Sequence, residues 1–545
     1  MNKLSSVTIL LLFCCTASVF FGCNREENDF DRKINAAAIN DFLDTIPVFP
    51  APQPASKTEG EISYSEDQTS DGYDMLCERQ QFEQTFVLDN LTLNAFDNTT
   101  ATNTAALYPG AIIKLQDLRD IGDLNTIGGY ERQPIQINST LGDLRKVDDP
   151  SSRGNVDKMI KEIEGQGENF PANISYEVVE AYSLEQAMYS LGIDARYLGN
   201  SVSSKLSVEK EVERKSVFIK FFQVYHTVSI SRPARAADFF GNSVTKEDLQ
   251  EIITADNPLG YIEEVAYGRI LVGKFTYTGT AFRSAIELET EVKKGLASGG
   301  GRYESENSEL SRNSTFTVAI LGGDAQEAAK VSGSGTDALR NAYDFLAEGG
   351  KDRSLGVPVQ YKVRYLGNDQ LFAVGGSAGF EAPECDMLNN HVTITNIRLT
   401  KFPPHKNKDD DTWDDIAVGD NKQPDIFPNI ERYTGSGWKV EHNLRSGRID
   451  NLTNDELPVD FKASYPIGRG SLKNDFKIVI WDDDSREFDV NEPKNERIGG
   501  IKFNLGKFLR TADNPQPEEA YPSTYTIGEG SSSVTLSLKW ASKPQ

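Results

Sequence analysis

The sequence predicts an α+β protein of several domains that ends in an all-β sandwich. A chain of 545 residues with 38% hydrophobic residues is too long for one core, so three or more domains are expected. Strand-like and helix-like segments are mixed up to about residue 388. Residues 391–545 instead hold short strand-like segments separated by acidic, Gly, Pro and Asn turns, which is typical of a sandwich.

Residues 1–23 have the features of an export signal. Lys3 precedes an apolar run that ends at Gly22-Cys23. A cysteine after a small residue resembles the lipobox of bacterial lipoproteins, in which Cys23 would be the lipidated first residue. Phe20 and Phe21 depart from the usual lipobox, so ordinary secretion is the alternative. We therefore expect an exported protein, either secreted or held as an outer-membrane or cell-surface lipoprotein.

Residues 24–82 are rich in Pro, Ser, Asp and Glu, which predicts a flexible arm with a linking strand. A mixed core is expected over residues 83–390. Its strand-like segments are QTFVLDNLTLNAF, PIQINSTL, VFIKFFQVYHTVSI, residues 263–279 and STFTVAILGG. Its helix-like segments are NVDKMIKEIEGQ and AQEAAKVSGSGTDALRNAYDFLAEGG. No segment after the signal has an apolar run long enough for a membrane-spanning helix.

Two segments of this core fit both a strand and a helix. In residues 281–296, apolar residues alternate with charged ones, yet they also recur at helical spacing. Residues 198–222 show the same ambivalence in part. The apolar positions of the strand pattern are Leu198, Val208, Val217, Ile219, Phe221, Phe282, Ile286, Leu288 and Val292. One interpretation is a segment stored as helix that later becomes a strand of a closed β-barrel. The alternative is a surface helix that never changes.

The sequence contains no recognisable catalytic constellation. Its four histidines are scattered, and no HExxH, GxSxG or phosphate-loop motif occurs. A formal net charge of −25 disfavours nucleic acid as a partner. We therefore predict a protein that is not an enzyme and requires no cofactor. A glycosidase that uses only carboxylates remains as the enzymatic alternative.

Two cysteines, Cys77 and Cys385, remain after the signal region. In an exported protein they could form a disulfide or stay as two separate buried thiols. The sequence leaves both alternatives open.

Seven sequence words between about residues 105 and 388 carry a family resemblance. They are ALYPGA, RQPIQIN, KVDDP, QVYHTVS, VAYGRILV, STFTVAILGGDAQEAAKV and GVPVQYKVRYL. In this order and at similar spacing, they resemble the cholesterol-dependent cytolysins, the thiol-activated pore-forming toxins. The resemblance implies an elongated multidomain protein of the cytolysin/perforin type, with a bent antiparallel sheet flanked by helical clusters. These clusters would unfurl into two membrane-inserting β-hairpins per subunit.

The resemblance also implies roles for single residues. Tyr182 matches an aromatic residue that meets its partner on the neighbouring subunit, and Phe316 matches that partner. Gly322 and Gly323 match the glycine pair at which an edge strand bends away. The pore-forming subdomain would comprise about residues 176–230 and 273–347, and the ambivalent segments fall within it.

The chain departs from the family in its last domain. The Trp-rich undecapeptide of the cholesterol-binding members is not visible, so the sequence does not predict cholesterol recognition. The chain is similar instead to cytolysin-like proteins of Gram-negative bacteria, some of which act as long and short partners after proteolysis. We expect the long partner, with residues 391–545 binding a glycan or lipid receptor on the target membrane. It would form a homo-oligomeric ring or a hetero-oligomer with a short partner. The alternative is a surface lipoprotein that binds a glycan or protein without lysis.

The last domain also weakly resembles calcium-dependent lipid-binding sandwiches. Its candidate ligands are Asp414, Asp415, Asp425, Asp482 and Asp484. Clustered loop carboxylates supply the oxygen ligands that calcium prefers. Solvated acidic loops in an acidic protein are the alternative.

Overall fold

A computed structural model describes residues 32–69, 72–92, 106–142, 144–164, 173–198, 200–208, 214–278, 314–321, 331, 333–334, 341–342, 344–345, 356–405, 423–483 and 495–543. The chain divides into two compact units. The larger unit comprises the chain up to Gly60 together with Gln81–Ala382, and the smaller unit comprises Glu61–Gln80 and Pro383–Gln545.

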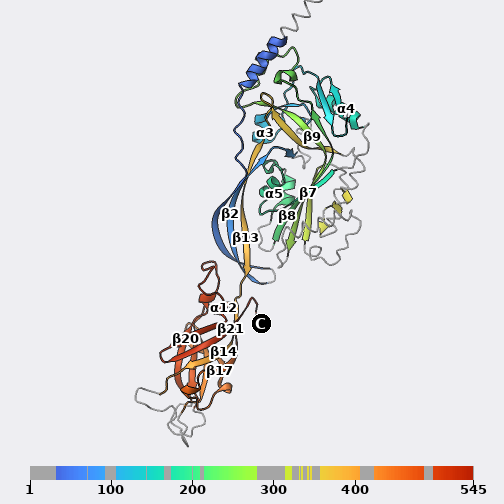
Figure 1. The fold of residues 1–545 in the computed structure, drawn as a ribbon. Helices are drawn as coiled ribbons and strands as arrows, with labels where there is room; N and C mark the ends of the chain where they lie inside the picture. Colours follow the sequence, from blue (N-terminus) through green and yellow to red (C-terminus); the bar gives the residue numbers. More distant parts are fainter. Residues whose placement is uncertain are drawn as a thin grey trace, which may run out of the picture. The chain divides into compact units, whose positions relative to one another are not determined.

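A ten-stranded antiparallel sheet forms the centre of the larger unit (Figure 1). Its main path runs β11–β10–β9–β8–β5–β6; β7 also pairs with β8, β12 and β4 with β9, and β3 with β12. The strands are β3 (Leu91–Thr92), β4 (Ile112–Lys114), β5 (Ile135–Ser139), β6 (Leu144–Val147), β7 (Asn173–Glu180), β8 (Arg214–Ile230), β9 (Leu259–Thr278), β10 (Ser314–Leu321), β11 (Gly333–Ser334) and β12 (Val357–Tyr365). The described parts of PIQINSTL, VFIKFFQVYHTVSI, residues 263–279 and STFTVAILGG therefore lie in this sheet, as expected from their content of β-branched and aromatic residues. Of the described part of QTFVLDNLTLNAF, only Leu91–Thr92 does.

Short helices lie around this sheet. They are α3 (Leu115–Ile121), α4 (Arg153–Glu164), α5 (Leu184–Ser190), α6 (Asn200–Leu206) and α7 (Lys246–Gln250). In α4, the predicted helix, Val156, Ile160 and Ile163 are buried. Their spacing of four and three places them on one side of the helix, so this side faces the core. Among the described residues, no helix is both long and apolar enough to cross a membrane.

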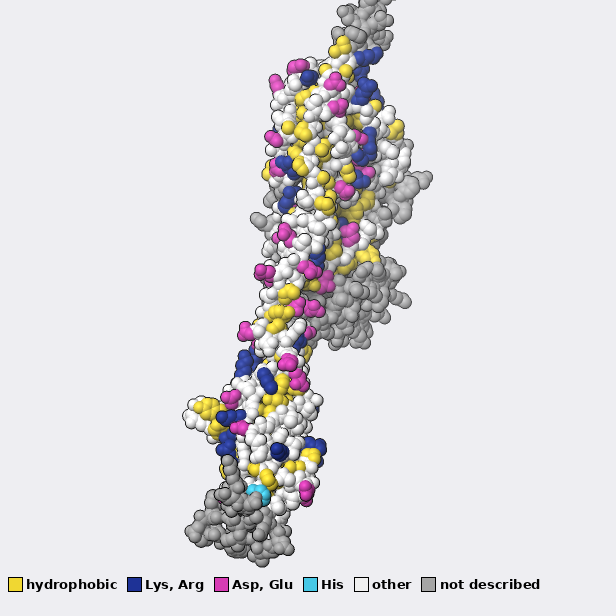
Figure 2. Space-filling view, turned by 60° about the vertical axis from the view of Figure 1, so that its left-hand side comes forward, with side chains coloured by type: hydrophobic (Ala, Val, Ile, Leu, Met, Phe, Trp, Pro, Cys, Tyr) yellow, Lys and Arg dark blue, Asp and Glu magenta, His cyan; other side chains and the backbone are white. Residues whose placement is uncertain are grey.

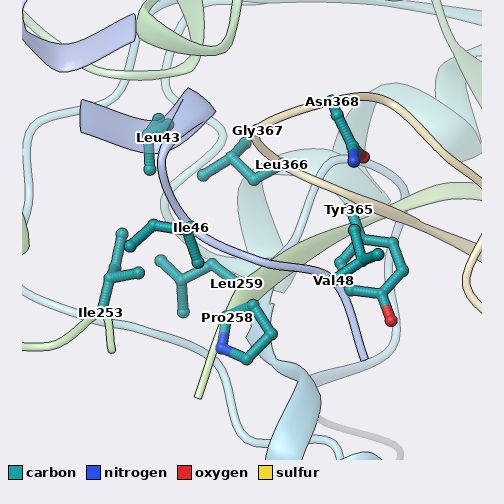
Figure 3. Close-up of a pocket in the computed structure, with 10 residues that line it drawn as sticks. All are labelled: Leu43, Ile46, Val48, Ile253, Pro258, Leu259, Tyr365, Leu366, Gly367 and Asn368. Atoms are coloured by element: carbon teal, nitrogen blue, oxygen red, sulfur yellow. The ribbon is translucent and has the colours of Figure 1, made fainter. Parts of the chain in front are cut away.

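The prediction of a flexible arm is wrong for residues 32–44, whereas the linking strand that it also included agrees with a strand at Ser56–Gln68. Residues 32–44 are helical, and Ile39 and Leu43 are buried in the core of the larger unit. Asn35 Nδ2 donates to Val244 O at 2.7 Å, which ties this helix to the loop before α7. Figure 3 shows Leu43 at a small pocket that is also lined by Leu259 and Leu366. Ile39 and Leu43 are four positions apart, so they lie on the same side of the helix and pack against the core, although the surrounding sequence is rich in polar residues.

Three strands, β1 (Ser56–Gln68), β2 (Asp74–Leu88) and β13 (Val374–Met387), form a separate sheet in the order β1–β2–β13. The division between the two units falls within these strands. Cys77 of β2 and Cys385 of β13 form a disulfide inside the smaller unit. The structure thus decides between the alternatives that the sequence left open.

The smaller unit contains a β-sandwich, which confirms the predicted fold of the C-terminal region. One sheet has the order β17–β14–β21–β20 and the other β16–β15–β18–β19. Their strands are β14 (His391–Lys401), β15 (Ile426–Tyr433), β16 (Trp438–Asn443), β17 (Val459–Ile467), β18 (Phe476–Asp482), β19 (Glu496–Phe503), β20 (Thr524–Glu529) and β21 (Ser532–Ala541), and α12 (Arg469–Leu472) precedes β18. Alternate residues such as Ile394, Ile430, Ile478 and Leu536 fill the core between the sheets.

Candidate functional site: a sheet covered on both faces and capped at one edge

The candidate site is the part of the larger sheet built from β7, β8, β9 and β10. Every neighbouring pair is antiparallel, and β10 follows β9 from Ser314↔Tyr277 to Leu321↔Ile270. The short strand β11 pairs with the outer side of β10 through Phe316↔Gly333. Without β11, that side of β10 would present unpaired peptide groups, so β11 caps an edge strand.

The first face of this sheet, which we call the aromatic face, carries Val217, Ile219, Phe221, Leu271, Phe275, Phe316 and Val318. These residues occupy alternate positions, so they point to the same side. The rings of Phe275 and Phe316 are 4.3 Å apart and stacked. Val331 and Phe345, which flank β11 in the sequence, are buried in the same cluster. The segment that caps β10 therefore also covers the aromatic face.

Gly273 of β9 is the position that lets Phe316 lie close to the sheet. Gly273 lies opposite Val318, next to Phe316 on β10. A Cβ atom at Gly273 would lie 2.1 Å from Phe316 Cε2, which no side chain tolerates. A glycine is needed here because of this close approach.

The second face, which we call the helical face, is covered by α5 and α6. Val202 and Leu206 of α6 are buried in the same core as Phe218 and Val272 of the strands. Two lysines, Lys220 of β8 and Lys274 of β9, also lie on this face and are buried. Lys220 Nζ donates to Leu191 O, and Lys274 Nζ donates to Ser207 O.

Tyr182 lies two residues after the end of β7, and its ring stacks on that of Phe380 at 5.9 Å and 9°. Its contact with a neighbouring subunit, which the resemblance implies, stays a prediction. Tyr176 lies within β7 itself, opposite Phe221 on the aromatic face, with 6.4 Å between the two rings. Tyr176 is therefore a second aromatic candidate at this edge strand.

Five of the predicted hairpin residues can be located. Val217, Ile219 and Phe221 are already in the strand β8 and are buried on the aromatic face. Leu198 and Val208 flank α6 and pack against the larger core. In residues 198–222, the helical part therefore ends at Leu206, and β8 begins at Arg214. The two periods of this segment correspond to two successive elements.

The remaining residues of the prediction lie outside the described part of the chain. They are Cys23, Phe282, Ile286, Leu288, Val292, Gly322 and Gly323. Phe316, in contrast, is described and lies with 2% of its surface exposed beneath the capping segment.

Two of the candidate calcium ligands lie together at one end of the sandwich. Asp425 N donates to Asp482 Oδ1 at 2.7 Å. Arg448 lies 3.4 Å from Asp425 and 2.8 Å from Asp483, so arginine neutralises part of this carboxylate charge. The hydrogen bond with Asp483 raises the pKa of Arg445. Asp414, Asp415 and Asp484 lie outside the described residues, within which no group of three or more His, Cys, Asp or Glu could hold a metal.

Sequence reasoning missed Tyr176, Gly273 and the two buried lysines. A signal for Lys220 and Lys274 was present, because each is a charged residue inside a strand whose neighbours are apolar. The role of Gly273 had no such signal, since it depends on which residue of β10 lies beside it.

The arrangement of these elements is similar to that of solved cytolysin structures. The structure matches the crystal structure of wild type pneumolysin with a TM-score of 0.53 over 87% of this chain and 94% of pneumolysin, at 20% identity. A structure of a non-hemolytic pneumolysin from Streptococcus pneumoniae gives a TM-score of 0.54 at 19% identity, covering 86% of this chain and 95% of that one. The chain therefore has the α+β fold of these solved cytolysin structures.

Sequence comparison then identifies the family. The thiol-activated cytolysin family model matches residues 81–379. Pneumolysin from Streptococcus pneumoniae is 30% identical over 401 residues, which cover 71% of this chain and 78% of pneumolysin. Perfringolysin O from Clostridium perfringens is 29% identical over 322 residues, 57% of this chain and 62% of that protein. The chain belongs to the thiol-activated cytolysin family, which confirms the predicted resemblance and makes it a homologue of pore-forming toxins.

Proposed function

We propose that this chain is a pore-forming toxin that assembles on a target membrane and inserts two amphipathic β-hairpins per subunit into a large β-barrel. Residues 391–545 bind the target, and about residues 191–222 and 282–315 supply the hairpins. The observation that carries this proposal is the edge of β10, which, in the part of the chain that the structure describes, is paired with the two-residue strand β11.

The geometry of the two outer strands supports assembly edge to edge. Within the described residues, β7 pairs with β8 and with no strand on its other side. When β11 leaves β10, β7 of a second subunit can pair with the exposed edge of β10. Tyr176 of β7 and Phe316 of β10 lie on the same face, so the two rings of neighbouring subunits can meet across the new pair.

The remaining predictions on partners and location belong to this proposal. The protein is exported, either secreted or held by a lipidated Cys23 at the outer membrane or cell surface, and its pore form lies in the membrane of the target cell. It forms a homo-oligomeric ring or assembles with a short partner after proteolysis. A glycan or a lipid headgroup is the receptor of the sandwich domain.

A reversible lock on the cap tests this proposal. Cysteines at the paired positions Thr315 and Ser334 would join β11 to β10. The oxidised double variant T315C/S334C should release no dye from target liposomes, and a reductant should restore release to the wild-type level. The matched control T526C/T535C joins β20 to β21 in the sandwich and should not block release. Wild type with and without reductant controls for the Cys77–Cys385 bond.

Two results would contradict the proposal in different ways. Full dye release by the oxidised T315C/S334C variant would mean that β11 need not leave β10. No release by wild type from any liposome or cell, after protease treatment and with a short partner present, would favour a surface protein that binds without lysis.

Calcium binding by the sandwich is a separate part of the proposal. Asp425 and Asp482 would contribute with Asp414, Asp415 and Asp484, and calcium would displace Arg448 from Asp425. Titration calorimetry of the full chain with millimolar calcium should give heat, and D425N/D482N should remove it. Absence of heat with the wild-type chain would leave the arginines as the only counter-charges.

A further inference from the structure

Three buried cationic side chains lie on the central strands β8 and β9. Each donates a hydrogen bond to a main-chain carbonyl of a segment that covers the sheet. These segments, which we call the covers, are α5–α6 on the helical face and the segment from β11 to Phe345 on the aromatic face. Lys220 of β8 donates to Leu191 O, Lys274 of β9 to Ser207 O and Arg269 of β9 to Phe345 O. All three side chains are largely buried, with 7%, 5% and 2% of their surface exposed. No function assigned above uses them.

Lys220 and Lys274 act on the helical face. Leu191 is the residue that ends α5, and Ser207 directly follows the last residue of α6. The last carbonyls of a helix have no partner within the helix and form the negative end of its dipole. Each lysine therefore satisfies a carbonyl group that the helix leaves open. Lys220 also forms an ion pair, at 2.9 Å, with Glu177, which lies opposite it on the neighbouring strand β7.

Arg269 acts on the aromatic face. Its Nη1 lies 3.2 Å from Phe345 O, and its guanidinium carbon lies 4.9 Å from the centre of the Phe345 ring. Phe345 belongs to the segment after β11 and is buried together with Phe316. Arg269 thus holds the segment that carries the cap of β10.

These contacts stabilise the covered sheet and can also be broken at low cost when the covering segments leave. A hydrogen bond from a cation to a carbonyl group is stronger than one between neutral groups, so the covering segments gain stability while the contacts exist. A buried cation also loses its hydration, and this loss is recovered when the cover leaves and water reaches the strand. Purely apolar side chains would hold the covers too but would oppose their release.

We propose that Lys220, Lys274 and Arg269 are positioning residues that pin the covers of the central sheet, the two lysines holding α5–α6 and the arginine holding the β11 segment. The pins are a property of the monomer. Their role in opening rests on the proposed function, since it assumes that these covers leave the sheet during insertion.

Hydrogen exchange of the full-length soluble monomer tests the pins directly. K220M and K274M keep the length of the aliphatic stem but remove the ammonium group. Each should increase exchange in peptides that contain α5 and α6 by about tenfold, and the double variant should increase it further. R269M should increase exchange by a similar factor in peptides that contain β11 and Phe345, with no change at α5–α6.

Lys362→Met is the matched control. Lys362 lies on β12 of the same sheet and pairs at 2.9 Å with Glu264, a residue of β9 rather than of a covering segment. K362M should leave both sets of peptides unchanged. Peptides from β5 and from β14 serve as internal references, so general destabilisation of a variant would appear there as well.

The exchange experiment tests the role of the three cations independently of pore formation. Unchanged or slower exchange at α5–α6 in K220M/K274M, with unchanged reference peptides, would overturn the proposal. The same holds if R269M and the lysine variants affect the same peptides, because each cover would then lack its own pin. If exchange changes as expected but wild type forms no pores, the positioning role of the three cations is confirmed and the proposed pore function is wrong. If pores form, K220M/K274M should release dye earlier than wild type.

Discussion

At the scale of single residues, Arg132 shows how two of the family words meet in space. Its side chain donates to Gly110 O at 2.8 Å and to Phe239 O at 3.0 Å. Gly110 has a φ of +85°, and a Cβ atom there would lie 2.5 Å from Ile135 Cδ1. Burial lowers the pKa of Arg132 to about 10. One contact therefore joins the words ALYPGA and RQPIQIN. In it, Arg132 donates to the carbonyl of Gly110, whose positive φ favours glycine.

Gly273 gives a prediction at the same scale. G273V would push the Phe316 ring off β9, because a Cβ atom would lie 2.1 Å from Phe316 Cε2. Such overpacking lowers the free energy of unfolding by about 1–3 kcal/mol. Urea unfolding of the full chain, followed by circular dichroism, measures the change.

Gly379 of β13 provides the control for this substitution. A Cβ atom at Gly379 would meet nothing within 4 Å, so G379A should change the unfolding free energy little. Equal stability of G273V and wild type would show that Phe316 does not need its place against β9.

At the scale of elements, the disulfide fixes β2 to β13 in the smaller unit. Cys77 and Cys385 are 308 residues apart in the sequence, and the Cys77 side chain is fully buried. A bond that closes so long a loop restricts the unfolded chain strongly. The sequence could not assign this bond, since it shows which cysteines exist but not which strands are neighbours.

C77S/C385S should therefore destabilise the smaller unit by about 2–5 kcal/mol. Tryptophan fluorescence reports this unit selectively, because all four tryptophans lie in residues 391–545. The midpoint of the fluorescence transition in urea should fall, and a reductant should lower it for wild type but not for the variant. An unchanged midpoint would mean that strand pairing alone holds β2 and β13 together.

At the scale of the whole molecule, side chains of both charges lie among one another on the face drawn in Figure 2, within the described residues, although the formal net charge is −25. Three carboxylates of the larger unit, Glu131, Asp149 and Asp248, accept hydrogen bonds from Ser243, Ser151 and Thr245, which lower their pKa values. Their contribution to stability is present above their ordinary pKa and is lost as the pH falls through the lowered values.

The melting temperature of the larger unit should therefore fall as the pH is lowered from about 5 to about 2. In the triple variant E131Q/D149N/D248N these groups no longer titrate, so the slope with pH should be flatter. Scanning calorimetry measures both, with tryptophan fluorescence identifying the transition of the smaller unit. The same slope for both proteins would show that other groups control acid unfolding.

The sequence by itself determined the family and most of the strands, but not the helix of residues 32–44. Alternating apolar residues in VFIKFFQVYHTVSI and the turn-rich C-terminal region sufficed for β8 and the sandwich, because these patterns are local. The tertiary structure decided which residues meet. It placed Tyr176 within β7, Gly273 beneath Phe316, and Lys220 at the end of α5. Such contacts depend on strand register, and a shift of one residue would move every side chain to the other face.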